Sequence, residues 1–260
     1  MARYIRFSRS AYYGVVAAIP LLVAYELLLA AGAGAAPVAV RNAADAWLRM
    51  VLAGFGLRPS QVTLGMILVL ILCVPLLRRA HTPLHWRYLL LMLLEAAAYS
   101  LVLGLLIQGI LHLLLAPLLR DAGVDATTAL QMLLPSGVAA GGPLAQGGWS
   151  MESGRMQALA LSLGAGLFEE FVFRVLLLGM LMAVLRLVFA GWLCAALSIV
   201  TAAFLFALAH HVGPLGEPLT AQAFLFRWVA GLLFTLLYYA RGFGVTAYAH
   251  ALYDIRILLF

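Results

Sequence analysis

The sequence contains no lysine, only two cysteines and few charged residues of any kind. All 16 cationic residues are arginines, and charged residues make up only 10% of the chain, against about 25% in a typical soluble domain. Because 65% of the residues are hydrophobic, no soluble core would bury the apolar surface. A net charge of +6 would suggest a nucleic-acid partner if the protein were soluble. The composition therefore predicts an integral membrane protein that contacts the lipid bilayer and no nucleic acid.

Nothing in the sequence marks an independent second domain. Cys73 and Cys194 both lie in apolar runs, which support neither a disulfide framework nor a paired-cysteine metal site. The apolar stretch after the first ten residues is too long for a cleaved signal peptide, so we interpret it as the first transmembrane helix. We expect one membrane domain, with N-terminal helices and connections in residues 1–150 and catalytic helices in residues 151–260.

Apolar runs long enough to cross a bilayer recur along the chain. A transmembrane helix needs about 17–25 predominantly apolar residues. The sequence therefore predicts an all-α fold, a polytopic bundle of about seven or eight transmembrane helices. The predicted spans are residues 11–33, 60–77, 86–118, 156–184, 188–210, 220–240 and 243–260.

Two segments between these spans have a different composition. Residues 37–55 mix charged side chains with Trp47 and Leu48, which suits an amphipathic helix in the membrane interface. An ordinary connector outside the membrane fits that segment equally well. Residues 120–150 are rich in glycine, proline and aspartate and are predicted to form a loop outside the membrane.

The distribution of arginine predicts the orientation of the chain. If the N-terminus is cytoplasmic, the loops on that side contain arginines and no carboxylate, whereas the opposite loops also contain acidic residues. This asymmetry follows the positive-inside rule and predicts a cytoplasmic N-terminus. The arginine-only, alanine- and leucine-rich composition favours the cytoplasmic membrane of a bacterium.

Ionisable side chains inside the predicted spans concentrate in the C-terminal half. Each such group costs at least about 2.5–3.5 kcal/mol near the bilayer centre, so it needs a partner, a neutralising proton or a function. The N-terminal half offers Glu26, Glu95, Gln108 and His112. The C-terminal half offers Glu169, Glu170, Arg174, His210, His211, Arg227, His250, Asp254 and Arg256. We therefore expect the residues that carry out the protein's chemistry to lie in the C-terminal half.

Two adjacent acids lie within one predicted span. Helical spacing puts Glu170 and Arg174 on one face, where they form an ion pair. Glu169 points about 100° away and has no such local partner. A carboxylate without a cation in a low dielectric is a candidate general base. The alternative is that both acids only hold helices together.

The histidines lie near the ends of the following spans. His210 and His211 precede a helix stop at Gly213, and a histidine at such a position is usually only hydrogen-bonded. His250 and Asp254 share one face of the last span, four residues apart, and form either a bifunctional polar site or a pair that neutralises itself.

Helix rise gives these groups different predicted depths. Glu169 and His210 lie about 25 Å and about 30–36 Å from the turn near Arg186, at 1.5 Å per residue. His250 and Asp254 lie only about 12–20 Å beyond the next turn by the same count. We therefore expect helix tilt, or a turn inside the membrane, to bring them together.

At these residues the sequence resembles the CPBP family of intramembrane proteases, which includes the CAAX-processing type II prenyl endopeptidases and the bacterial Abi proteins. The family signature is Glu-Glu-x-x-x-Arg, then Phe-x-x-x-His, then His-x-x-x-Asn or Asp. This chain has Glu169-Glu170-Phe171-Val172-Phe173-Arg174, Phe206-Ala207-Leu208-Ala209-His210 and His250-Ala251-Leu252-Tyr253-Asp254. The resemblance covers about residues 155–256, and three motifs in order are far more specific than any one.

The resemblance implies a set of site residues. The catalytic residues would be Glu169, His210, His250 and Asp254, supported by Glu170, Arg174 and Phe206. Glu169 would be the base, His210 would help to activate water, and His250 with residue 254 would stabilise the tetrahedral intermediate.

Asp254 stands where the family more usually has asparagine. An asparagine amide donates a hydrogen bond to an oxyanion, whereas an ionised aspartate repels it. Asp254 is therefore protonated, or only orients His250, or binds a cation. In the last case His210, His250 and Asp254 would form a two-histidine, one-carboxylate set for a divalent metal such as zinc.

These features predict an intramembrane endopeptidase that hydrolyses a membrane-associated peptide with water activated by Glu169 and His210, without an acyl-enzyme. The sequence has no His-Glu-x-x-His zinc motif and no Gly-x-Ser-x-Gly nucleophile motif. The alternative is a non-catalytic membrane scaffold, or a transporter that uses the same polar cluster as an ion site.

Overall fold

The computed structural model describes residues 2–32, 40–78, 83–121, 151–213 and 216–259, and these residues form helices and no β-strand. The first five helices are α1 (Ala2–Ser8), α2 (Ala11–Gly32), α3 (Ala43–Gly54), α4 (Pro59–Leu77) and α5 (Trp86–Asp121). The C-terminal part contains α8 (Met151–Gly164), η1 (Ala165–Glu169), η2 (Phe171–Leu177), α9 (Leu178–Leu185), α10 (Gly191–Ala209), α11 (Ala221–Arg241) and α12 (Phe243–Leu259). The predicted all-α class is confirmed.

Each of the seven predicted spans contains a helical segment among its described residues. Five helices are long and apolar enough to cross a membrane: α2, α4, α5, α10 and α11. The continuous segment 151–185 is divided among α8, η1, η2 and α9, and α12 has only 17 residues. The protein is thus a helical integral membrane protein with five candidate spans in its described part, and the predicted number of seven or eight is not confirmed. After Asp121, the predicted loop 120–150 lies outside the described residues.

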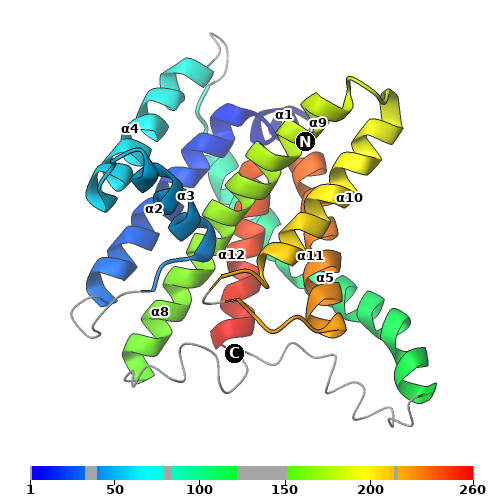
Figure 1. Ribbon diagram of the computed structural model, residues 1–260. Coiled ribbons are helices and arrows are strands. Elements are labelled where there is room, and N and C mark those ends of the chain that lie inside the picture. The colour runs from blue at the N-terminus through cyan, green and yellow to red at the C-terminus, as the bar shows by residue number, and fades with distance from the viewer. Residues whose placement is uncertain (1, 33–39, 79–82, 122–150, 214–215, 260) are drawn as a thin grey trace.

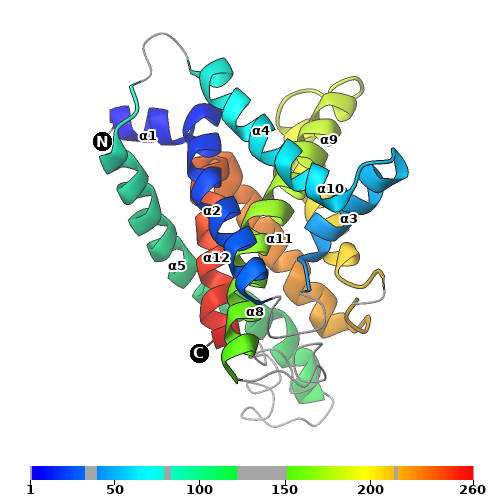
Figure 2. The same cartoon turned by 90° about the vertical axis from the view of Figure 1, so that its left-hand side faces the viewer.

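Successive long helices run in alternating directions, so that the two termini lie at opposite ends of the bundle (Figure 1). The short α1 lies across the end of α2 (Figure 2). In the centre, α12 packs against α2, α5, α8 and η1, and α10 packs against α11. This arrangement places the three motif-bearing segments next to one another.

Helix α4 contributes little to the protein core. Val62 is its only buried residue, and Leu68, Ile71 and Leu76 are exposed. Exposed leucines and isoleucines along a long apolar helix are expected where the neighbour is lipid rather than water. Figure 1 shows α4 at the edge of the bundle, where such contact is available.

The segment predicted as an interfacial helix or a connector contains helix α3. Its buried face carries Asp45 and Arg49, whereas Met50 and Val51 are exposed. A soluble connector helix would bury its apolar side and expose its charges. The inverted pattern favours the interfacial interpretation of residues 37–55.

Gly166 allows η1 to contact α12 closely. A Cβ atom at Gly166 would lie 2.3 Å from the carbonyl oxygen of Ala247 and 2.9 Å from the backbone nitrogen of Ala251. Both neighbours are backbone atoms, so the helices would have to separate. Since Glu170 lies one turn along the same segment, this contact helps to set the distance between the acids and His250.

We expect Gly166→Ala to destabilise the protein by about 1–3 kcal/mol, the usual effect of overpacking, and to reduce activity as well. Thermal unfolding in detergent would measure the first effect. Gly179→Ala is the matched control, because nothing lies within 4 Å of a Cβ there. Equal unfolding temperatures for the two variants would contradict the proposed close contact.

Candidate functional site

The two acids of the first motif lie in a π-helical part of the segment 151–185. Glu169 is the last residue of η1, and Glu170 lies between η1 and η2. π-Helical turns are rare and frequently occur at functional sites. Glu169 is 8% exposed and Glu170 is fully buried, so both carboxyl groups point into the protein.

Glu170 is shared by a cation and an imidazole. Its Oε1 lies 3.1 Å from Nη1 of Arg174, which confirms the ion pair predicted from their spacing. The same oxygen lies 2.6 Å from Nδ1 of His250, which donates a hydrogen bond to it. Glu170 therefore connects the first motif with the third.

Arg174 is held mainly by charge and by an aromatic ring. Its guanidinium carbon lies 4.4 Å from the ring centroid of Phe206, a cation–π distance. None of its three side-chain nitrogens makes a well-oriented hydrogen bond within the described residues, although the side chain is 1% exposed. The buried cation thus depends on Glu170 and Phe206.

His210 faces Glu169 with its outer ring nitrogen. Its Nδ1 lies 2.8 Å from the carbonyl oxygen of Phe206, so in the neutral imidazole Nδ1 carries the proton and Nε2 keeps its lone pair. Nε2 lies 3.7 Å from Oε2 of Glu169. The ring also packs edge-on against Phe206, with centroids 4.6 Å apart.

His250 lies between two carboxyl groups. While Nδ1 donates to Glu170, Nε2 lies 3.7 Å from Oδ2 of Asp254, beyond hydrogen-bond distance. The ring of His250 stacks on Phe234 with centroids 4.5 Å apart. Glu170, rather than Asp254, therefore forms the hydrogen bond that orients His250, because it approaches from another helix in line with the ring nitrogen.

The structure resolves the predicted difference in depth. Glu170 lies about 24 Å from Arg186 and His250 lies about 12 Å from Gly242 at 1.5 Å per residue, yet their side chains are hydrogen-bonded. The hairpin of α9 and α10 extends past the turn between α11 and α12, which accounts for the mismatch (Figure 1).

Two residues near the acids were not predicted as site residues. The side-chain amide of Asn42 donates to Oε1 of Glu169 over 2.9 Å. Arg227 pairs with Glu217 and lies within electrostatic reach of Asp254 and Glu169. An asparagine before a helix is a recognisable N-cap signal, but nothing in the sequence connects that cap to Glu169.

The geometry gives no support to the suggested three-ligand metal set. A catalytic zinc site has three protein ligands converging on one point. Among the described residues, no three His, Cys, Asp or Glu side chains are placed to hold a metal ion. The acids and histidines instead form pairs.

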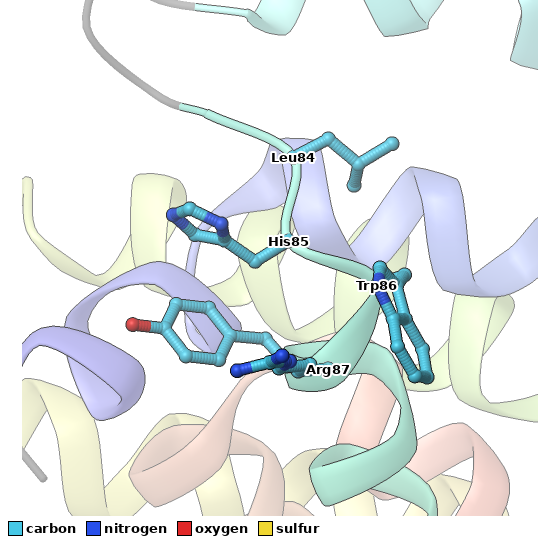
Figure 3. Close-up of a pocket in the computed structure, with 5 residues that line it drawn as sticks. Leu84, His85, Trp86 and Arg87 are labelled. Atoms are coloured by element: carbon cyan, nitrogen blue, oxygen red, sulfur yellow. The ribbon is translucent and has the colours of Figure 1, made fainter.

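The pocket at the start of α5 is separate from this site. Leu84, His85, Trp86, Arg87 and Tyr88 line it (Figure 3). It contains none of the motif residues, and it lies at the end of the bundle where the N-terminus lies (Figure 2). We therefore assign no part of the acid and imidazole chemistry to it.

Apolar helices around buried carboxyl and imidazole groups identify an integral membrane protein with a candidate polar site, since such groups are costly to keep in a bilayer. Residues 152–256 match the model of the family described as Type II CAAX prenyl endopeptidase Rce1-like. This match confirms the family resemblance predicted from the three motifs. Searches of curated proteins and of solved structures return no match.

Proposed function

We propose that the protein is an intramembrane endopeptidase that hydrolyses a peptide bond with a water molecule activated by Glu169 and His210. The observation that carries the proposal is the 3.7 Å separation between Oε2 of Glu169 and Nε2 of His210. Oε2 is buried and has no hydrogen-bond partner among the described residues. Two acceptors that face each other without a donor are the natural place for one water molecule.

A water molecule beside this pair, within hydrogen-bond distance of both atoms, donates one hydrogen to the carboxylate and the other to the imidazole. Its oxygen lone pairs then point away from both groups, toward a substrate carbonyl. Glu169 takes the proton as the water oxygen attacks, and the proton passes to the leaving amine. No acyl-enzyme forms, because the nucleophile is water rather than a side chain.

His250 is placed to stabilise the oxyanion of the tetrahedral intermediate. With a proton on each ring nitrogen, it donates Nδ1–H to Glu170 and directs Nε2–H toward the developing charge. Arg174 balances the charge of Glu170, and Phe206 holds both Arg174 and His210 by ring contacts. Asp254 lies beside Nε2 of His250, and its negative charge favours the doubly protonated ring. The hydrogen bond from Nδ1 of His250 to Glu170 is kept.

The alternatives of a scaffold or a transporter account less well for this geometry. A scaffold does not need a carboxylate oxygen without a partner, which is costly to keep buried. An ion site would bring several oxygen ligands to one point, whereas these carboxyl groups each face a different imidazole. The match to a protease family also favours hydrolysis.

The expected substrate is a membrane-embedded or membrane-associated peptide, because the site lies among apolar helices. We keep the predicted cytoplasmic N-terminus and bacterial membrane as parts of the proposal. The family resemblance permits prenylated peptides and other peptide tails, and the structure favours none of them.

Comparing membrane peptides from cells that produce the wild-type protein or Glu169→Gln tests the function. We expect a defined set of cleaved peptides with the wild type and their uncleaved precursors with Glu169→Gln. Equal insertion of the two proteins, measured by membrane fractionation, is the required control. Identical peptide profiles at equal expression would refute the proposed activity.

A further inference from the structure

Asn42 reaches Glu169 from outside the family match. It lies 127 residues earlier in the sequence, and its side-chain nitrogen donates to Oε1 of Glu169 over 2.9 Å. Asn42 is 6% exposed. Because Oε1 is occupied in this way, Oε2 is the oxygen left to face His210.

The helix cap fixes which way the Asn42 amide points. Its Oδ1 accepts a hydrogen bond from the backbone nitrogen of Ala44 over 2.9 Å, which caps α3. If the amide were flipped, its oxygen would face the Glu169 carboxylate and its nitrogen would face a backbone N–H, so both bonds would be lost. The amide therefore presents its donor to Glu169.

A buried ionic cluster holds the start of α3 in place. Asp45 accepts hydrogen bonds from Arg41 over 2.8 Å and from Arg49 over 2.7 Å. Both arginines also bind Glu26 on α2, at 3.1 Å and 3.0 Å. Burial alone would lower the pKa of Arg41, but its hydrogen bonds to the two acids raise it, so the cation is kept.

Further contacts connect Asn42 to α2 and α8. The Asn42 backbone nitrogen donates to the hydroxyl of Tyr25 over 3.2 Å, and that hydroxyl donates to Asp45 over 2.9 Å. On α8, a Cβ atom at Gly164 would lie 2.8 Å from Cβ of Asn42, so only glycine permits this approach. Asn42 is thus held on three sides.

We propose that Asn42 is a positioning residue, held by the α3 cap and the ionic cluster, that fixes the Glu169 carboxylate so that Oε2 faces His210. This inference rests on the proposed function, because it assumes that Glu169 is the base. It extends the functional site beyond the three motifs to the N-terminal half of the chain.

Asn42→Ser is the sharpest test, because serine caps a helix about as well as asparagine, lacks the N–H that binds Glu169 and adds no charge beside that carboxylate. We expect kcat for peptide hydrolysis to fall about 10- to 100-fold, as for loss of a hydrogen bond to a charged group. KM should stay within twofold of the wild type. The thermal unfolding midpoint should fall by only a few degrees, because a single buried hydrogen bond is lost and the cap of α3 is kept.

Thr220→Ala is the matched control for the cap. Thr220 caps α11 by accepting from the Ala223 nitrogen over 3.1 Å, and no contact connects it to Glu169 in the described residues. Loss of this helix cap in Thr220→Ala should leave kcat unchanged. Wild-type kcat in Asn42→Ser would overturn the inference, as would an equal fall in kcat in Thr220→Ala.

The outcomes also separate this inference from the proposed function. If the wild type cleaves a peptide, Glu169→Gln does not and Asn42→Ser does so normally, only the role of Asn42 fails. If Glu169→Gln retains full activity, the assignment of the base fails and the role of Asn42 fails with it.

Discussion

Purified Glu169→Gln should lose about 10²- to 10⁴-fold in kcat, the contribution usual for a general base. Glutamine has the same shape and keeps an oxygen that accepts from Asn42, so the fold should survive. What it lacks is the ability to take a proton from the water held beside His210. KM should change little, since the substrate is not expected to bind Glu169 directly. Hydrolysis of a peptide identified in cells, measured in detergent micelles, would give both constants.

Glu217→Gln is the matched control for this experiment. Glu217 is also a carboxylate near the end of α10, but it pairs with Arg227 and has a side chain that is 43% exposed. Its replacement should leave kcat within about twofold, since exposed ion pairs contribute only about 0.2–1 kcal/mol. Full activity in Glu169→Gln would show that another group, such as Asp254, accepts the proton.

The three motifs identified the acids and imidazoles because each motif is local. Four-residue spacing on a helix predicts that Glu170 meets Arg174 and that His250 lies beside Asp254, and both pairs are present. The apolar runs likewise predicted all seven helical segments. Spacing within one helix and total hydrophobicity are properties of the sequence alone, so these inferences needed no coordinates.

Contacts between helices were beyond the reach of the sequence. Rise along each helix placed Glu169 and His250 at different depths, because helix length does not show how far the α9–α10 hairpin extends. The hydrogen bond between Glu170 and His250 is 2.6 Å long and spans 80 positions. Nothing in the local pattern of either residue indicates that Glu170, rather than Asp254, would orient the ring.

Asn42 is a clearer example of a contact between helices that the sequence does not predict. The sequence around it predicted an amphipathic helix in the membrane interface or a connector. In the structure the charges of Asp45 and Arg49 are turned inward, with Asp45 fully buried. Inward charges around a polar site are a tertiary arrangement, and hydropathy along one segment does not report it.

The largest effect on stability should come from Arg174→Met. Arg174 and Glu170 are 1% and 0% exposed in their side chains, and they lie 3.1 Å apart. Removing Arg174 leaves Glu170 with His250 as its remaining partner, and loss of one partner of a buried ion pair typically costs about 3–5 kcal/mol. We therefore expect a strong fall in the unfolding midpoint, measured in detergent, and a loss of activity that by itself does not separate folding from catalysis.

The double variant Glu170→Gln with Arg174→Met separates the two effects. Replacing a whole buried ion pair by neutral groups of similar volume is often neutral or stabilising, so the unfolding midpoint should return to within a few degrees of the wild type. Glutamine still accepts from Nδ1 of His250, but its carboxylate charge no longer favours the doubly protonated ring. Activity should therefore stay about 10²- to 10³-fold low, the usual loss when one oxyanion donor is removed. Recovery of activity together with stability would show that the pair only holds the helices, and that His250 stabilises no oxyanion through Glu170.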